Sequence, residues 1–364
     1  MTKSSPNKSR LLKFLNDEYG KRIISGQMDT SWTINSKMDM ITRVFSDTGK
    51  YPALKGFDLI QLPYNYPPFF GGMEQIEEAI EWWEGKNNGK RLLPDNPDIH
   101  GIVTFCWHWR AGNNYAFYTD KTDFRIPWIK DGSNINGKPG AEDKSKTEGK
   151  LDTEDKSEIK GRLDTESENF KIMIDDMDKA ASLLNILKEK DIPVLWRPLH
   201  EAAGGWFWWG ASGPAPYIAL WEYMYDYYTN VKGLDNLIWV WSAEDTAWFP
   251  NPDTVEITGV DLYTENYSSL KEEFEKAKVM APTKDRITAL SENDRLPDPD
   301  ECLKENMMWS WFMTWNDMRF KEGETRKDNF WTGEFHNPQA HKEKVYNHPL
   351  VITLDKLPDI TNYT

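Results

Sequence analysis

Two glutamates stand where a catalytic carboxyl pair could form. Glu201 lies in WRPLHEAAGGWFWWG and directly follows an apolar run, and Glu292 closes another apolar run in ITALSEND. Facing carboxyl groups suit cleavage of a glycosidic bond, because one can protonate the leaving oxygen while the other acts at the anomeric carbon. With 59 acidic residues in the chain, a single glutamate is a weak signal, and the aromatic, glycine-rich surroundings of Glu201 strengthen it.

The residues after Glu201 indicate a ligand-binding turn. Ala202–Gly205 leave little side-chain volume beside the carboxyl group, and the two glycines permit a tight backbone turn. The aromatic run Trp206–Trp209 follows immediately. Four successive aromatic residues in a loop cannot all point into the core, so we expect at least one to line a cleft.

Other candidate residues stand at the ends of neighbouring apolar runs. Arg197 and His200 share one run, and Arg197 either holds a catalytic carboxylate or forms a structural ion pair. His108, flanked by tryptophans in CWHWR, is either structural or a donor to a sugar hydroxyl. Tyr263 in GVDLY could hydrogen-bond the nucleophile, and Trp315 could serve as a stacking platform.

Other chemistries find no support in the sequence. The six histidines form no HExxH motif and no His/Cys cluster at ligand spacing, and no DxDxDG-type calcium loop is present. There is also no glycine-rich phosphate loop and no GxSxG elbow. We therefore expect neither a metal nor a cofactor.

Eight apolar runs alternate with helical patterns and would position these residues. Several runs are apolar at successive positions, which is typical of strands buried on both faces of a parallel sheet. The predicted strands are Arg22–Gln27, Phe57–Leu62, Gly101–Trp107, Pro193–His200, Leu237–Ser242, Ile257–Tyr263, Ile287–Glu292 and Met308–Trp315. Amphipathic helices are predicted at Met73–Asn87, Phe170–Lys190 and Pro216–Val231. The alternation favours an α/β fold, a (β/α)8 TIM barrel, over an open sheet.

A barrel of this kind would bring the two glutamates together. Functional residues of such barrels lie at the carboxyl ends of the strands. Glu201 follows the fourth predicted strand and Glu292 ends the seventh. These strands lie on opposite sides of the ring, so the two carboxyl groups can face each other across its mouth.

Length and composition limit the alternatives. We predict one catalytic domain over residues 1–364, with a charged, solvated insertion at 137–169 in the third βα connection, because that segment lacks large apolar residues. The net charge of −15 argues against a nucleic-acid partner. No apolar run approaches the roughly 18 residues of a membrane span, so we expect no membrane partner. Two cysteines cannot form a disulfide framework.

These motifs resemble glycoside hydrolase family 26, and its β-mannanases in particular. The strongest match is Trp196–Gly210, around Glu201. Further matches run in order along the chain as LLKFLNDEYGKRIISGQ, GIVTFCWHWR, LIWVWS, GVDLY, ALSEND, WSWFMTW and VYNHPLVITLDKLPD. The likeness covers almost the whole chain and departs at 137–169, where the family's connection is usually shorter.

The resemblance implies a role for each candidate residue. Glu201 would be the general acid/base and Glu292 the nucleophile of a retaining, cofactor-free double displacement. Among the substrate-binding residues, His200 and Trp206 would shape the site around the acid/base, and Tyr263 would contact the nucleophile. His108 and Trp315 would line the subsite on the non-reducing side of the cut. For a retaining enzyme we expect carboxyl groups roughly 5–5.5 Å apart.

The resemblance also implies the substrate. We expect an endo-β-1,4-mannanase acting on β-mannan polysaccharides and manno-oligosaccharides, and the small residues Ala202–Gly205 favour this branch. The alternatives are a β-1,3-1,4-glucanase or β-1,3-xylanase of the same family, or a non-catalytic carbohydrate-binding barrel. Because a polymeric substrate cannot enter a cell intact, we expect a secreted protein whose signal peptide is absent from this sequence. We also expect a monomer.

Overall fold

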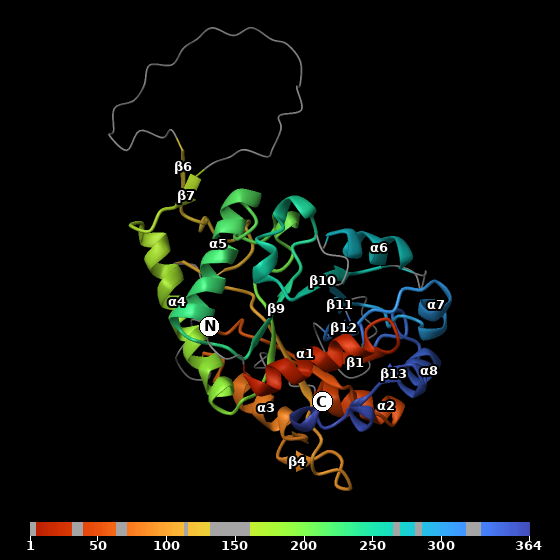
Figure 1. The fold of residues 1–364 in the computed structure, drawn as a ribbon. Coiled ribbons are helices and arrows are strands. Elements are labelled where there is room, and N and C mark those ends of the chain that lie inside the picture. Colours follow the sequence, from red (N-terminus) through yellow and green to blue (C-terminus); the bar gives the residue numbers. More distant parts are fainter. Residues whose placement is uncertain are drawn as a thin grey trace, which may run out of the picture.

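The computed structural model describes residues 5–30, 39–62, 71–112, 116–131, 161–264, 270–280, 286–317 and 329–364. Within them, eight parallel strands close into a ring that helices surround (Figure 1). The last strand pairs with the first, which confirms the predicted (β/α)8 TIM barrel. The ring consists of β1 (Ile23–Met28), β2 (Leu54–Asp58), β5 (Ile102–Cys106), β8 (Val194–Arg197), β9 (Leu237–Trp241), β10 (Ile257–Leu262), β11 (Ile287–Asn293) and β12 (Trp311–Thr314).

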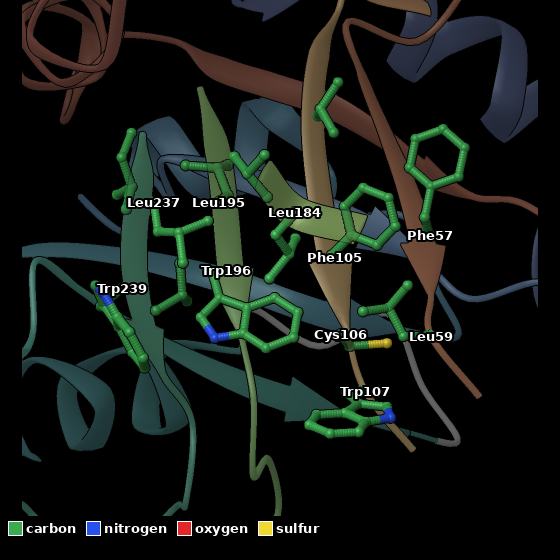
Figure 2. Packing of buried hydrophobic residues seen from close by; sticks show 14 of the residues in the cluster. Phe57, Leu59, Phe105, Cys106, Trp107, Leu184, Leu195, Trp196, Leu237 and Trp239 are labelled. Atoms are coloured by element: carbon green, nitrogen blue, oxygen red, sulfur yellow. The ribbon is translucent and has the colours of Figure 1, made fainter. Parts of the chain in front are cut away.

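The strands are apolar at successive positions because both of their faces are covered. Every residue of β1, β9, β11 and β12 is buried, since one face meets the barrel interior and the other meets the helices. In Figure 2, Trp107, Trp196 and Trp239 lie along neighbouring strands of the ring. Among the described residues, eleven tryptophans are less than 2% exposed, so most of the tryptophans pack in the core.

The second strand is the one whose position the sequence predicted poorly. It spans Leu54–Asp58, whereas the apolar pattern predicted Phe57–Leu62. Lys55 interrupts the pattern, yet its side chain is only 2% exposed, because Nζ lies 2.6 Å from Asp29 and 3.2 Å from Glu78. A paired lysine can occupy a buried strand position that a hydrophobic pattern does not reveal.

The helices of the described residues are α1 (Pro6–Glu18), α2 (Met40–Thr48), α3 (Met73–Trp83), α4 (Glu168–Glu189), α5 (Pro214–Asp226), α6 (Lys271–Met280), α7 (Pro299–Lys304) and α8 (Gln339–Asn347). The three predicted helices correspond to α3, α4 and α5, and these five further helices were not assigned bounds from the sequence. The Ser167 side chain caps α4 by accepting from the N–H of Phe170, so the helix starts before the predicted first residue. None of the helices in the described ranges is long and apolar enough to span a bilayer.

Most of the predicted insertion at 137–169 lies outside the described residues, which resume at residue 161. Of its last nine residues, 161–163 form a strand, 164–167 form a turn, and the remaining two begin a helix. Strand β7 (Gly161–Leu163) pairs antiparallel with β6 (Trp128–Lys130), and α4 starts at Glu168. Three further short strands, which a pattern of period two cannot reveal at this length, are β3 (Lys86–Asn87), β4 (Lys90–Arg91) and β13 (Val351–Ile352).

Candidate active site

A cavity of about 440 Å³ lies at the carboxyl ends of the barrel strands. Six of the seven predicted site residues line it, namely Glu201, Glu292, His108, Trp206, Tyr263 and Trp315. The seventh, His200, is buried beside it, with its Nε2 3.3 Å from Nε2 of His108. The lining is completed by Asp58, Ile60, Arg110, Phe117, Tyr118, Phe207 and Phe330.

Glu292 is buried at the end of β11 and held at both oxygens. Its Oε1 accepts from the guanidinium of Arg197, and its Oε2 accepts from the hydroxyl of Tyr263 at 2.7 Å. A bulge in β11 brings Glu292 level with Asp261 of β10 and leaves Ser291 without a partner in the β10–β11 ladder. A bulge redirects the side chains next to it, which here places the Glu292 carboxylate at the floor of the cavity.

Asp261 completes the support beneath Glu292. Its Oδ2 accepts from Arg197 at 2.7 Å, and its Oδ1 accepts from the Ser291 hydroxyl at 2.6 Å. Arg197 also donates to Ser242 Oγ at 3.2 Å. The guanidinium therefore lies between two buried carboxylates and fixes their relative position. The sequence left open whether Arg197 holds a catalytic carboxylate or forms a structural ion pair, and its guanidinium contacts both Glu292 and Asp261. Asp261 was missed, although its place in GVDLY, two residues before Tyr263, could have indicated it.

Glu201 lies opposite Glu292, and its backbone has a conformation that few non-glycine residues adopt. Its φ is 53°, in the left-handed region, and its N–H donates to the Ser242 carbonyl at 2.8 Å. Trp206 Nε1–H donates to Glu201 Oε2 at 2.9 Å. The turn after Glu201 also needs Gly210, because a Cβ there would lie 2.0 Å from the Ala202 carbonyl oxygen. Backbone strain of this kind persists where the surrounding structure holds it, and it is frequent at functional sites.

Aromatic side chains form the wall beside Glu201. Tyr118 stacks on Phe207 with 5.4 Å between ring centroids, and the Thr119 N–H donates to the Trp206 carbonyl at 2.8 Å. The side chains of Tyr118 and Trp206 nevertheless remain 46% and 43% exposed. Exposed aromatic faces fixed in this way offer flat apolar surface and suit contact with the CH-rich faces of a sugar.

The two catalytic candidates, Glu201 and Glu292, differ in pKa. Burial, followed by the charges of Asp261, Glu292 and Glu244, raises the pKa of Glu201 to about 9. Burial and Asp261 raise the pKa of Glu292 to about 7, and Arg197 opposes this rise. One oxygen from each of Glu201, Asp261 and Glu292 lies within 4.8 Å of the others. When the site holds one proton on this pair, Glu201 carries it and Glu292 is ionised.

This arrangement predicts how stability depends on pH. Glu201 in the unfolded chain loses its proton near pH 4.5, whereas the folded protein keeps it until about pH 9. The stability from this group is therefore fully present below pH 4.5 and is lost as pH rises through 9. Glu201→Gln cannot ionise, so its melting temperature should exceed that of the wild type by a few degrees at pH 9 and by less at pH 4.5. Thermal unfolding across pH measures this difference, and a constant offset would contradict it.

His108 and His200 form a second polar layer next to the carboxyl groups. Asp58 accepts from the backbone N–H of His108 at 3.0 Å and lies 2.6 Å from its Nδ1. Burial, and then the Arg197 charge, lowers the pKa of His200 far below its usual range, so His200 is neutral. The Nε2 atoms of His108 and His200 lie 3.3 Å apart, and the tautomer of each ring decides which of the two donates.

The carboxyl cluster does not offer a free set of metal ligands. Glu201, Asp261 and Glu292 have the residue types and spacing of a cation site. However, the oxygens of Asp261 and Glu292 already accept hydrogen bonds, and the Arg197 guanidinium supplies the positive charge between them. Hard cations need several unoccupied oxygens, so this cluster does not fit one.

A second group has metal-binding residue types, and it does not fit an ion either. Asp58, Cys106 and His108 lie close enough to share a metal. Both Asp58 oxygens are engaged by His108, and burial raises the pKa of the Cys106 thiol well above its usual range. A metal ligand must be deprotonated, and this thiol holds its proton strongly.

Two curated relatives align with nearly the whole chain. The mannan endo-1,4-beta-mannosidase of Thermothelomyces thermophilus is 30% identical over 357 residues, which are 95% of this chain and 60% of that protein. Mannan endo-1,4-beta-mannosidase B of Piromyces sp is 30% identical over 359 residues, which are 98% of this chain and 53% of that protein. The chain thus spans 53–60% of the length of these relatives.

Two solved structures share the fold and 27% of the sequence. The GH26-CBM35 β-(1,4)-mannanase of Podospora anserina gives a TM-score of 0.73 over 99% of this chain and 69% of that one. The β-mannanase from a symbiotic protist of the termite Reticulitermes speratus, complexed with gluco-manno-oligosaccharide, gives 0.74 over 99% and 97%. The family model of glycosyl hydrolase family 26 matches residues 2–356, so the chain belongs to this family.

Proposed function

We propose that this protein is a retaining endo-β-1,4-mannanase with Glu201 as general acid/base and Glu292 as nucleophile. The observation that carries the proposal is the contrast between the two carboxyl groups. Glu201 retains its proton, Glu292 is held by two donors, and their oxygens lie within 4.8 Å of each other. Retaining enzymes have carboxyl groups roughly 5–5.5 Å apart and inverting enzymes about 6.5–9.5 Å, so the short spacing supports retention.

In the first step, a Glu292 oxygen attacks the anomeric carbon while Glu201 gives its proton to the glycosidic oxygen. The bond to the leaving sugar breaks as the ester between Glu292 and the sugar forms. Arg197 and Tyr263 bind the Glu292 oxygens and hold the attacking carboxylate in place. Because these contacts exist before substrate binds, little reorganisation is needed at the moment of attack.

In the second step, Glu201 acts as the base. Formation of the ester removes the negative charge of Glu292, which is one cause of the raised pKa of Glu201. The pKa of Glu201 therefore falls once the intermediate has formed, and the carboxylate can take a proton from water. That water attacks the anomeric carbon, the ester bond breaks, and Glu292 is released as a carboxylate.

The proposed substrates are mannan, glucomannan and galactomannan. They are supported by the names of the two relatives and by the gluco-manno-oligosaccharide in the termite-symbiont structure. Activity on β-1,3-1,4-glucan or β-1,3-xylan is the alternative. Assays of reducing ends released from all of these polysaccharides would separate the two, and NMR of the first product would give its anomer. Release from glucan or xylan alone would reject the mannanase assignment.

Trp206 should set the basic side of the pH profile. Its indole N–H stabilises the ionised form of Glu201 and so lowers the pKa of that carboxyl group. Trp206→Phe keeps an aromatic ring and removes the donor. We expect the basic limb of kcat/KM to move to higher pH and kcat to fall about tenfold, because the acid/base gives up its proton less readily.

The pH profile of kcat/KM on mannohexaose measures this effect. Trp128→Phe is the matched control, because Trp128 lies in β6 and its Nε1 has no hydrogen-bond partner in the described part of the chain. A basic limb that stays in place or moves to lower pH in Trp206→Phe would contradict the predicted role.

We also propose that the protein acts outside the cell as a monomer. The proposed polymeric substrate supports the first part, because a polysaccharide cannot cross a membrane intact. A signal peptide in the complete coding sequence and light scattering after size-exclusion chromatography are the respective tests.

A further inference from the structure

A third glutamate, Glu244, contacts the catalytic centre and has no role in the mechanism above. It follows β9 at the carboxyl end of the barrel, and its side chain is half-buried. Its backbone φ is 73°, so Glu244 shares with Glu201 a left-handed conformation that is unfavourable for a non-glycine residue. Such a conformation persists only where surrounding contacts hold it.

The contact that holds Glu244 is made to the nucleophile side of the cavity. Its Oε1 accepts from the backbone N–H of Asp261 at 2.9 Å. Strand β10 pairs with β9 only at Ile257 and Thr258, so β9 provides no partner at Asp261. The Glu244 carboxylate takes the place of the missing strand carbonyl at the point where the β10–β11 register shifts.

The residues beside Glu244 contact the acid/base side of the cavity. The Ser242 carbonyl accepts from the N–H of Glu201 at 2.8 Å, and the Ala243 carbonyl accepts from the N–H of Ala203 at 3.1 Å. The segment 242–244 therefore bonds to the turn that carries Glu201 on one side. On its other side it bonds to the strand that carries Asp261.

We propose that Glu244 is a positioning residue for the double displacement, and that its carboxylate holds the Asp261 backbone and thereby the Arg197–Glu292 contact. Three hydrogen bonds connect the two glutamates: the Asp261 N–H donates to Glu244, Arg197 donates to the Asp261 carboxylate, and Arg197 donates to Glu292. The proposal rests on the proposed function, because it assigns Glu244 to the same reaction.

The charge of Glu244 should also raise the pKa of Glu201. The charged groups around Glu244 are Asp261 on β10, Glu292 on β11, Arg197 on β8, and Glu201. Burial and Asp261 raise the pKa of Glu244 to about 8, so it is ionised where Glu201 begins to titrate. A negative charge there keeps the proton on Glu201.

Two substitutions separate the hydrogen bond from the charge. Glu244→Ala removes both, and we expect kcat/KM on mannohexaose to fall roughly tenfold or more, since the buried Asp261 N–H loses its acceptor. Glu244→Gln keeps an acceptor oxygen and removes the charge. We expect it to retain activity within about threefold at its optimum, with the basic limb of kcat/KM moved to lower pH by about half a unit or more.

Asp245→Asn is the matched control. Asp245 is the adjacent acid, it is exposed, and its side chain caps the following turn by accepting from the Ala247 N–H, as asparagine can. This variant should keep the wild-type pH profile. Thermal unfolding of all variants shows whether they are folded. If Glu244→Ala does not fold, the pH profile of Glu244→Gln still tests the proposal.

Three outcomes would overturn the proposal. They are a Glu244→Ala enzyme within twofold of wild type at every pH, a Glu244→Gln enzyme with an unmoved basic limb, and an equal shift in Asp245→Asn. The proposed function fails separately, if the wild-type protein releases no reducing ends from mannan.

Discussion

Glu292→Ala should lower kcat on mannan on the order of 10⁴-fold or more, because the enzyme then has no atom that can form the covalent intermediate. A dinitrophenyl mannobioside should not restore normal turnover, since the missing group is the nucleophile and not the acid. Arg197 keeps Asp261 as a partner at 2.7 Å, so the barrel should stay folded. Added azide can occupy the space of the lost carboxylate and attack the anomeric carbon directly, which would give a glycosyl azide of inverted configuration.

The control is Asp176→Asn, which removes another buried carboxyl group. Asp176 lies on α4 and accepts from the Trp109 indole at 3.0 Å, a bond that asparagine can also accept. It lines no part of the cavity, so this variant should retain activity. Residual mannan hydrolysis above about 1% in Glu292→Ala, with retained configuration, would show that another group is the nucleophile.

The sequence predicted those site residues that lie at the carboxyl ends of recognisable strands. Glu201 and Glu292 each follow an apolar run, and barrel closure brings the ends of β8 and β11 to one mouth. Tyr263 was expected to reach the nucleophile because it follows a third such run, and its hydroxyl lies 2.7 Å from Glu292. Local pattern and barrel topology suffice for these placements.

The remaining contacts depend on strand register and on side-chain burial, which cannot be read from the hydrophobic periodicity of the sequence. The bulge that sets Glu292 level with Asp261 arises at Ser291, and nothing in the strand pattern distinguishes that residue. Glu244 also follows an apolar run, yet its contact with the Asp261 N–H exists only because β9 ends before β10 does. The burial of His200 below His108 likewise follows from the packing of two strand ends.

Glu201→Ala should behave differently from Glu292→Ala, and the contrast tests both roles. With mannan the leaving group is a sugar alkoxide that needs a proton, so kcat/KM should fall on the order of 10³-fold. With a dinitrophenyl mannobioside the leaving group departs without a proton, so glycosylation should keep a rate within about tenfold of wild type. The glycosyl–enzyme intermediate then accumulates, because water attack lacks its base, and a burst of dinitrophenolate should precede slow steady turnover.

Azide distinguishes the acid/base from the nucleophile in this variant. An anionic nucleophile needs no base, so azide should accelerate turnover of Glu201→Ala on the dinitrophenyl substrate, whereas wild type should not respond. Because azide attacks the covalent intermediate on Glu292, its product should be a glycosyl azide of retained configuration, opposite to that from Glu292→Ala. The raised pKa of Glu201, about 9, predicts in addition that the variant lacks the wild-type basic limb in its pH profile. If both variants gave the same azide product, or if the basic limb persisted in Glu201→Ala, then Glu201 would not be the acid/base.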